Sequence, residues 1–205
     1  GSLHTLYTDE SFARDDYRGI AAWLRTTATP DDAILLNAPN QWEVFTYYYG
    51  SESGDQTPVY PAPYRPDQEE ALNWVEDIVA DHLGEQLFVL TWGDTESSPQ
   101  HHIERALTVH AYKASEEWVT TVRVARYGTA PLVEQPAKTL DVRVGEHIYL
   151  IGYHLPGAPQ HPAAVLPVTL FWTAEAMPSE RAKVFVHLVG SDTGLAAQVD
   201  MGPQA

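Results

Sequence analysis

The sequence contains no cysteine, few basic residues and no long apolar run, and each absence narrows what the chain can be. Without cysteine it has no disulfide framework, thiol nucleophile or zinc–thiolate site. The 12 basic and 28 acidic side chains give a formal net charge of −16, which argues against a nucleic-acid binder. The longest apolar runs, such as residues 33–36 and 87–90, have the length of strands rather than of membrane spans.

Motifs for nucleotide binding and acyl transfer are missing as well. The first predicted strand-to-helix turn contains Pro39-Asn40 instead of a glycine-rich phosphate loop, and there is no Gly-x-Ser-x-Gly elbow. An apolar content of 44% with 20% charged residues still predicts a folded chain. Because the sequence begins Gly-Ser, without an initiator Met or a signal peptide, we expect it to be a fragment of a longer protein.

Up to Tyr127, helical and strand patterns alternate. Apolar spacing predicts a helix from Thr8 or Asp9 to just before Pro30, and further helices over residues 41–49, 67–83 and 99–109. Short apolar or alternating runs predict strands at 33–38, 58–60, 86–92 and 118–127. This order predicts an α/β domain over residues 1–127, built as a small three-layer sandwich with a mainly parallel sheet.

After Gly128 the helical period disappears. Alternating runs separated by Gly and Pro predict an all-β sandwich domain over residues 128–205, with strands at 140–144, 147–153, 165–172, 183–189 and 195–200. Residues 1–127 carry a net charge of −13 and the remainder −3. The sequence stops soon after its last predicted strand, so we expect an incomplete, truncated sandwich with an open strand edge, covered by a neighbouring chain or by N-terminal residues.

In a parallel α/β sheet, ligands bind outside the carboxyl ends of the strands. Candidate ligand-binding residues follow the first three predicted strands of this sheet: Asn37, Asn40, Gln41, Trp42 and Glu43, then Tyr64 and Arg65, then Trp92 and Asp94. Polar groups beside aromatic rings suit a sugar, whose hydroxyls need polar partners and whose C–H faces stack on rings. Alternatively, Asn37 and Asn40 stabilise a turn and cap a helix, while Trp42 packs in the core.

Other clusters of chemically active side chains give weaker signals. His101 and Glu104 would share a helix face, but no third ligand follows at helical spacing, so we predict no metal site and no cofactor. The paired acids Asp15-Asp16 and Asp31-Asp32 are expected to be solvated surface.

Two segments of the first part carry a family resemblance. Residues 37–49 (NAPNQWEVFTYYY) and 110–113 (HAYK) resemble the soluble region that follows the membrane helices in bacterial GT-C class membrane glycosyltransferases. These enzymes are related to the protein mannosyltransferases of glycosyltransferase family 39. Residues 150–153, 166–172 and 183–188 are similar to the β-sandwich module that follows in the same proteins.

The resemblance implies a membrane enzyme that takes sugar from a polyprenyl-phosphate donor and keeps its essential acid in the membrane part. No catalytic residue is therefore assigned here. The implied role is a non-catalytic accessory region on the extracytoplasmic side of the cell membrane, which holds a glycan, acceptor or lipid-linked sugar near the membrane-embedded part of the same polypeptide. Two alternatives are a free-standing sugar-processing enzyme with Glu43 or Asp94 as general acid–base, and a structural adaptor that self-associates through the sandwich edge.

Overall fold

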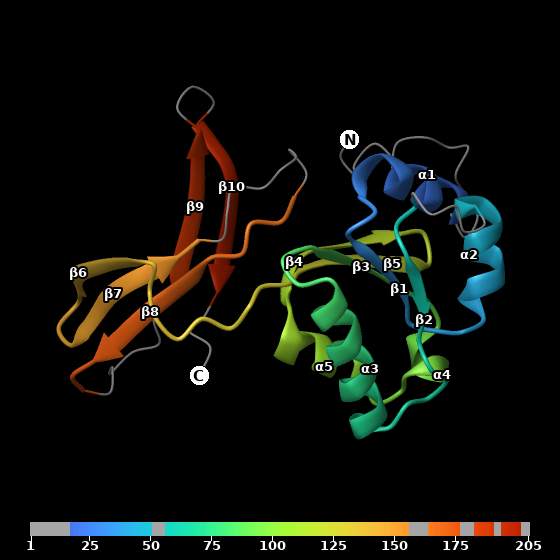
Figure 1. Ribbon diagram of the computed structural model, residues 1–205, viewed down its shortest axis with the longest axis horizontal. Helices are drawn as coiled ribbons and strands as arrows, with labels where there is room; N and C mark the ends of the chain where they lie inside the picture. Colours follow the sequence, from blue (N-terminus) through green and yellow to red (C-terminus); the bar gives the residue numbers. More distant parts are fainter. Residues whose placement is uncertain (1–16, 51–55, 156–163, 177–182, 191–193, 202–205) are drawn as a thin grey trace. The chain divides into compact units, whose positions relative to one another are not determined.

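The computed structural model describes residues 17–50, 56–155, 164–176, 183–190 and 194–201 (Figure 1). By its contacts the chain divides into two units. The first, the α/β unit, comprises residues 1–132 with 155–168, and the second, the β unit, comprises residues 133–154 with 169–205. The expected class, an α/β part followed by an all-β part, is confirmed.

The α/β unit is built on a five-stranded sheet in the order β2-β1-β3-β5-β4. Its strands are β1 (Ala33–Leu36), β2 (Val59–Pro61), β3 (Gln86–Thr91), β4 (Tyr112–Val119) and β5 (Val122–Gly128). β1 pairs in parallel with both β2 and β3, whereas β5 pairs antiparallel with β3 and β4. The sheet is therefore mixed, with three parallel strands extended by a β4–β5 hairpin.

That hairpin stands where the sequence pattern predicted a single strand over residues 118–127. The chain reverses next to Thr120, whose φ of 54° lies in the left-handed region. Val119 and Val122 pair across the turn, and both are buried in the same core. Because the two-residue period continues through the turn and neither Gly nor Pro marks it, the pattern did not reveal the reversal.

Helices cover both faces of the sheet (Figure 1). α1 (Tyr17–Thr27) packs against α2 (Gln41–Tyr49) on one face, and α3 (Gln68–Asp81) packs against α5 (His102–His110) on the other. The sequence did not predict the short α4 (Asp94–Ser97), which follows β3. The start of the first predicted helix, residues 8–16, lies outside the described residues.

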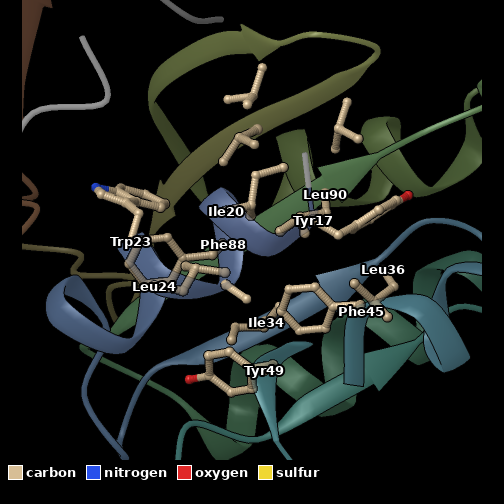
Figure 2. Packing of buried hydrophobic residues seen from close by; sticks show 14 residues of the cluster. Tyr17, Ile20, Trp23, Leu24, Ile34, Leu36, Phe45, Tyr49, Phe88 and Leu90 are labelled. Atoms are coloured by element: carbon tan, nitrogen blue, oxygen red, sulfur yellow. The ribbon is translucent and has the colours of Figure 1, made fainter. Parts of the chain in front are cut away.

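Alternate side chains of β1 and β3 divide between two cores. The set facing α1 and α2 is shown in Figure 2 and consists of Ile34, Leu36, Phe88 and Leu90. The set facing α3 and α5 consists of Ala33, Leu35, Leu87 and Val89. All eight are buried, which explains why both strands read as continuous apolar runs rather than alternating ones.

Side-chain hydrogen bonds shape the start of two helices. The Glu70 N–H donates to Oδ1 of Asp67 at 2.9 Å, which gives α3 a regular N-cap. At α2, the N-cap residue Asn40 makes no side-chain cap bond within the described part of the chain, so it does not play the predicted capping role. Gln41, the first residue of α2, instead ties the helix to the loop before it, because its Oε1 accepts the Ala38 N–H at 3.1 Å.

Asp32 corrects the expectation of a solvated acidic pair. Its side chain is only 1% exposed, whereas Asp31 lies on the surface. The Thr29 N–H donates to Asp32 Oδ2 at 2.7 Å and the Gln86 N–H donates to Oδ1 at 2.8 Å. The carboxylate thus satisfies buried backbone donors at the amino end of the sheet, opposite the predicted site. Asp15 and Asp16 lie outside the described residues.

The β unit contains two antiparallel sheets. β6 (Lys138–Val144), β7 (Ile148–His154) and β8 (Thr169–Ala174) form one in that order, and β9 (Val184–Gly190) pairs with β10 (Gly194–Met201) in the other. Among the residues of this unit whose burial the structure describes, only Gly152 is buried. A Cβ on Gly152 would collide with Pro136 and the Lys138 carbonyl oxygen, so glycine allows the chain to pack closely beside β7.

Candidate functional site

The order in which the parallel strands connect marks one end of the sheet as a crevice. α2 carries the chain from β1 to β2 over one face, and α3 carries it from β2 to β3 over the opposite face. Connections that diverge in this way leave a crevice outside the carboxyl ends of the strands, where ligands bind in open α/β sheets. The predicted site residues all follow these strands, so the fold places them at this end.

Asn37 ties the loops after β1 and β3 together. Its side chain is 4% exposed, and its backbone N–H donates to the Leu90 carbonyl at 3.0 Å. Its Oδ1 accepts the Trp92 N–H at 2.9 Å, and its Nδ2 donates to Ser97 Oγ at 3.2 Å. Both polar ends of the side chain are used inside the protein, so Asn37 shapes the crevice rather than presenting a group to a ligand.

Arg65 fastens the loop after β2 to α4. Its φ of 51° is unusual for a residue with a side chain, and such strain costs on the order of 1–3 kcal/mol. The Arg65 N–H donates to the Ser97 carbonyl at 3.0 Å, and its Nε donates to the Glu96 carbonyl at 2.8 Å. The guanidinium also lies 5.3 Å from the ring centre of Tyr64. Tyr64 and Arg65 are both exposed, as a stacked pair beside α4.

A hollow of about 440 Å³ opens at the start of α2, and its lining is Pro39, Asn40, Trp42, Glu43 and Pro61. This volume lies within the range of about 300–1,000 Å³ that is typical of small-molecule sites. Trp42 is half-buried: it packs against the core under α1 and α2, and it also contributes to the hollow. Asn40 and Glu43 are exposed beside it.

The structure therefore brings together three of the nine predicted residues around this hollow, namely Asn40, Trp42 and Glu43. Gln41 lies between them in sequence but is only 1% exposed, and its Nε2 donates to Tyr17 Oη at 3.0 Å. Trp92 packs against the same core as Trp42. The side chain of Asp94 lies outside the described part of the structure.

Ser97 was missed because it belongs to the unpredicted α4, and no pattern in the sequence couples it to Asn37, 60 positions earlier. Pro61 was missed as a lining residue, although the predicted strand that ends beside it could have indicated its place. A proline at the end of a short edge strand fits there, because it supplies a rigid wall without needing a partner for an N–H.

A second, smaller cavity lies between α5 and the β4–β5 hairpin. Its free volume is about 20 Å³, enough for about one water molecule, and its polar lining includes Asn37, His101, Glu104 and Arg123. The difference in size favours the hollow at α2 as the place for a ligand.

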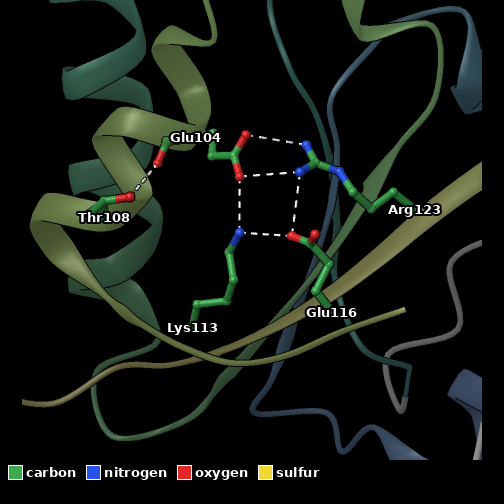
Figure 3. Close-up of polar contacts among 5 residues, drawn as sticks. All are labelled: Glu104, Thr108, Lys113, Glu116 and Arg123. Atoms are coloured by element: carbon green, nitrogen blue, oxygen red, sulfur yellow. Dashed lines mark hydrogen bonds and ion pairs between the residues drawn. The ribbon is translucent and has the colours of Figure 1, made fainter. Parts of the chain in front are cut away.

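Beside this small cavity four charged side chains form a closed ring of ion pairs (Figure 3). Lys113 Nζ lies 2.9 Å from Glu104 Oε1 and 2.7 Å from Glu116 Oε2, and Arg123 Nη1 lies 3.2 Å and 3.3 Å from the same two oxygens. The ring joins α5 to both strands of the hairpin. Since its two positive and two negative charges balance, it is suited to holding these elements together.

Burial alone would raise the pKa of Glu104, but hydrogen bonds from Arg123 and Lys113 outweigh it and lower that pKa to about 2. For Lys113, burial would lower the pKa, whereas bonds to Glu116 and Glu104 raise it overall. Glu104, which the sequence suggested with His101 as a possible pair of metal ligands, is thus engaged in the ion pairs. Within the described residues no group of three His, Asp or Glu side chains could hold a metal.

The chain was compared with known proteins. No family model, curated protein or solved structure matches the chain. Among the residues that the structure describes, no helix is both long enough and apolar enough to cross a membrane.

Proposed function

We propose that the α/β unit binds a neutral carbohydrate in the hollow beside α2 and has no catalytic role of its own. The proposal is supported above all by Trp42, which lines a hollow of about 440 Å³ together with the polar side chains of Asn40 and Glu43. A half-buried indole can stack against the C–H face of a sugar while its packed side keeps it in place.

The polar groups of the lining match sugar hydroxyls. The Asn40 amide both donates and accepts hydrogen bonds, and the Glu43 carboxylate accepts them. Glu43 is the one charged residue of the described lining, and residues 1–127 carry a net charge of −13. A sugar phosphate would be repelled there, so the chemistry favours an uncharged glycan over a phosphate-linked donor.

The same lining favours binding over catalysis. Glycoside-cleaving sites use two carboxyl groups about 5–9.5 Å apart, one of them with a raised pKa. The described lining offers the single carboxyl group of Glu43, which is exposed. The alternative of a free-standing enzyme with Glu43 as general acid–base therefore draws less support from this geometry than a binding role does.

The wider role in the proposal rests on the sequence resemblance to GT-C class glycosyltransferases. According to this proposal, the chain is an accessory region on the extracytoplasmic side of the cell membrane, and its partner is the membrane-embedded part of the same polypeptide. Bound at the hollow, the glycan acceptor or product would be held near the membrane active site.

The location can be tested because the chain has no cysteine. Glu69→Cys adds one thiol to this region, at an exposed position of α3, in the longest polypeptide that contains this sequence. We expect a membrane-impermeant maleimide to label it on intact cells, with the unsubstituted polypeptide as the control. Labelling that requires lysed cells would contradict an extracytoplasmic location.

Binding is tested by calorimetric titration with a panel of neutral saccharides built from glucose, mannose and galactose. Trp42→Ala is expected to weaken binding at least about tenfold, equivalent to about 1.4 kcal/mol. Trp42→Phe keeps most of the packing and should retain part of the affinity, which separates lost stacking from lost folding. Trp118→Ala is the matched control, because Trp118 is 54% exposed on β4, at the opposite edge of the sheet from β2.

A further inference from the structure

We infer that the binding surface continues from the hollow along α2 to Tyr47, so that the site takes an extended neutral oligosaccharide rather than a single sugar. This inference rests on the proposed function of the hollow and specifies the class of carbohydrate that it binds. Tyr47 was not among the residues predicted from the sequence.

Tyr47 lies on the same side of α2 as part of the hollow. It follows Glu43 by four residues in a continuous helix, so the two side chains are neighbours on one helix face. Four residues correspond to about 6 Å along the helix axis, which is comparable to the length of one pyranose unit. Val44, 38% exposed, lies four residues after Asn40 and three residues before Tyr47, so it adjoins both on the helix surface. The residues of α2 that line the hollow and the Tyr47 ring therefore form one strip along the helix, consisting of Asn40, Glu43, Val44 and Tyr47.

The Tyr47 ring is both accessible and held. Tyr47 is 81% exposed, whereas Phe45 and Tyr49 of the same helix are buried. The ring meets Tyr48 edge-to-face, with ring centres 5.1 Å apart and planes at 82°. A ring already held in place loses little freedom when a ligand stacks on it, and this favours binding.

Tyr48, the support for this ring, is itself fixed by α1. The guanidinium of Arg18 lies 5.5 Å from the centre of the Tyr48 ring, and Arg25 Nη1 donates to the Tyr48 carbonyl at 2.6 Å. Both cations are thus engaged with Tyr48. The strip itself carries only the negative charge of Glu43, so along its whole length it suits uncharged sugar units.

The test is a length series measured by calorimetric titration of the whole chain. Glucose, mannose and galactose are compared with their di- and trisaccharides, for the unsubstituted chain, Tyr47→Ala, Tyr47→Phe and Tyr112→Ala. For the unsubstituted chain we expect at least a fivefold gain in affinity from mono- to trisaccharide. Tyr47→Ala should remove that gain and leave monosaccharide affinity unchanged, while Tyr47→Phe should keep it because stacking needs the ring and not the hydroxyl.

Tyr112→Ala removes an exposed tyrosine from β4, at the far edge of the sheet, and should change nothing. A Tyr47→Ala chain that binds trisaccharides as tightly as the unsubstituted chain would overturn this inference and leave the proposed function standing. If no saccharide of the panel binds at millimolar concentration, both fail. Because Tyr47 is so exposed, the unfolding midpoint of its variants should match that of the unsubstituted chain, and this confirms that each variant is folded.

Discussion

The two units of this chain place their apolar side chains very differently. In the α/β unit, both faces of β1 and β3 are covered by helices, and the apolar side chains of these strands are buried. In the β unit, β9 is just as apolar in sequence, yet Phe185 is 59%, Leu188 50% and Val189 65% exposed. An apolar pattern therefore predicts that a strand forms, but not what covers it.

The difference has a consequence for stability. Buried apolar surface contributes about 25 cal/mol per Å² to folding, and the described residues concentrate that burial in the α/β unit. We therefore expect the α/β unit to resist unfolding more strongly than the β unit. Substitutions in both units test this expectation.

The largest effect is expected from removing matched aromatic side chains in the two units. Phe88 is fully buried, so Phe88→Ala should cost about 3–5 kcal/mol of unfolding free energy. Phe185→Ala should cost less than about 1 kcal/mol. Urea unfolding followed by circular dichroism measures both, and equal costs would mean that another surface covers Phe185 in solution.

Asn37 tests the crevice end of the α/β unit. Asn37→Ala removes the acceptor for the Trp92 N–H and the donor to Ser97, and should cost about 2–3 kcal/mol. Asn40→Ala, three residues later on the surface, should stay within about 0.5 kcal/mol. Thermal unfolding of both variants gives the difference, and similar values for the two would argue against Asn37 as the link between the loops.

Gly152 tests whether the β unit has a defined structure despite its exposed side chains. The Cβ of Gly152→Ala would meet Pro136 and the Lys138 carbonyl, so the substitution should cost about 1–2 kcal/mol. Amide resonances should shift in β6 and β7 and not in the α/β unit. Unchanged stability would show that this part of the β unit adjusts easily.

The smallest effect is expected at the ring of ion pairs. Because its pKa in the folded protein is about 2, below the ordinary value of 4.5, Glu104 contributes stability that is fully present above pH 4.5 and is lost as the pH falls toward 2. Partial exposure limits this to about 1 kcal/mol or less. Glu104→Gln should therefore destabilise the chain slightly at pH 7 and reduce its loss of stability between pH 5 and pH 2.

The control for that experiment is Glu76→Gln on the exposed face of α3. It should leave the acid dependence as it is in the unsubstituted chain. A Glu104→Gln chain with an unaltered acid profile would show that the ring contributes nothing measurable.

The sequence predicted the elements that tertiary packing reinforces. The spacing of Leu72, Val75, Ile78 and Val79 indicated α3, and Asp67 marked its start because an aspartate before an apolar-periodic run is a regular N-cap. The β4–β5 hairpin and α4 were not predicted. At the hairpin the turn residue carries no turn signal, and α4 is too short to show a helical period.

The candidate site was predictable only in part. Topology places residues after parallel strands at one end of the sheet, so the location followed from the pattern of strands. Residue type does not determine which way a side chain points at the first turn of a helix. Gln41 turns inward to Ala38 and Tyr17, whereas Asn40 and Glu43, its near neighbours, line the hollow.

Binding of a neutral glycan in the hollow at α2 can be followed residue by residue in a ¹⁵N NMR titration of the tryptophan side chains. The chain has 6 tryptophans, and Trp42→Phe assigns the indole N–H signal of Trp42. With the neutral trisaccharide panel, we expect a saturable shift of the Trp42 signal and no shift of the Trp118 signal. A Trp42 signal that stays in place at millimolar saccharide, or that moves only together with Trp118, would contradict glycan binding in the hollow.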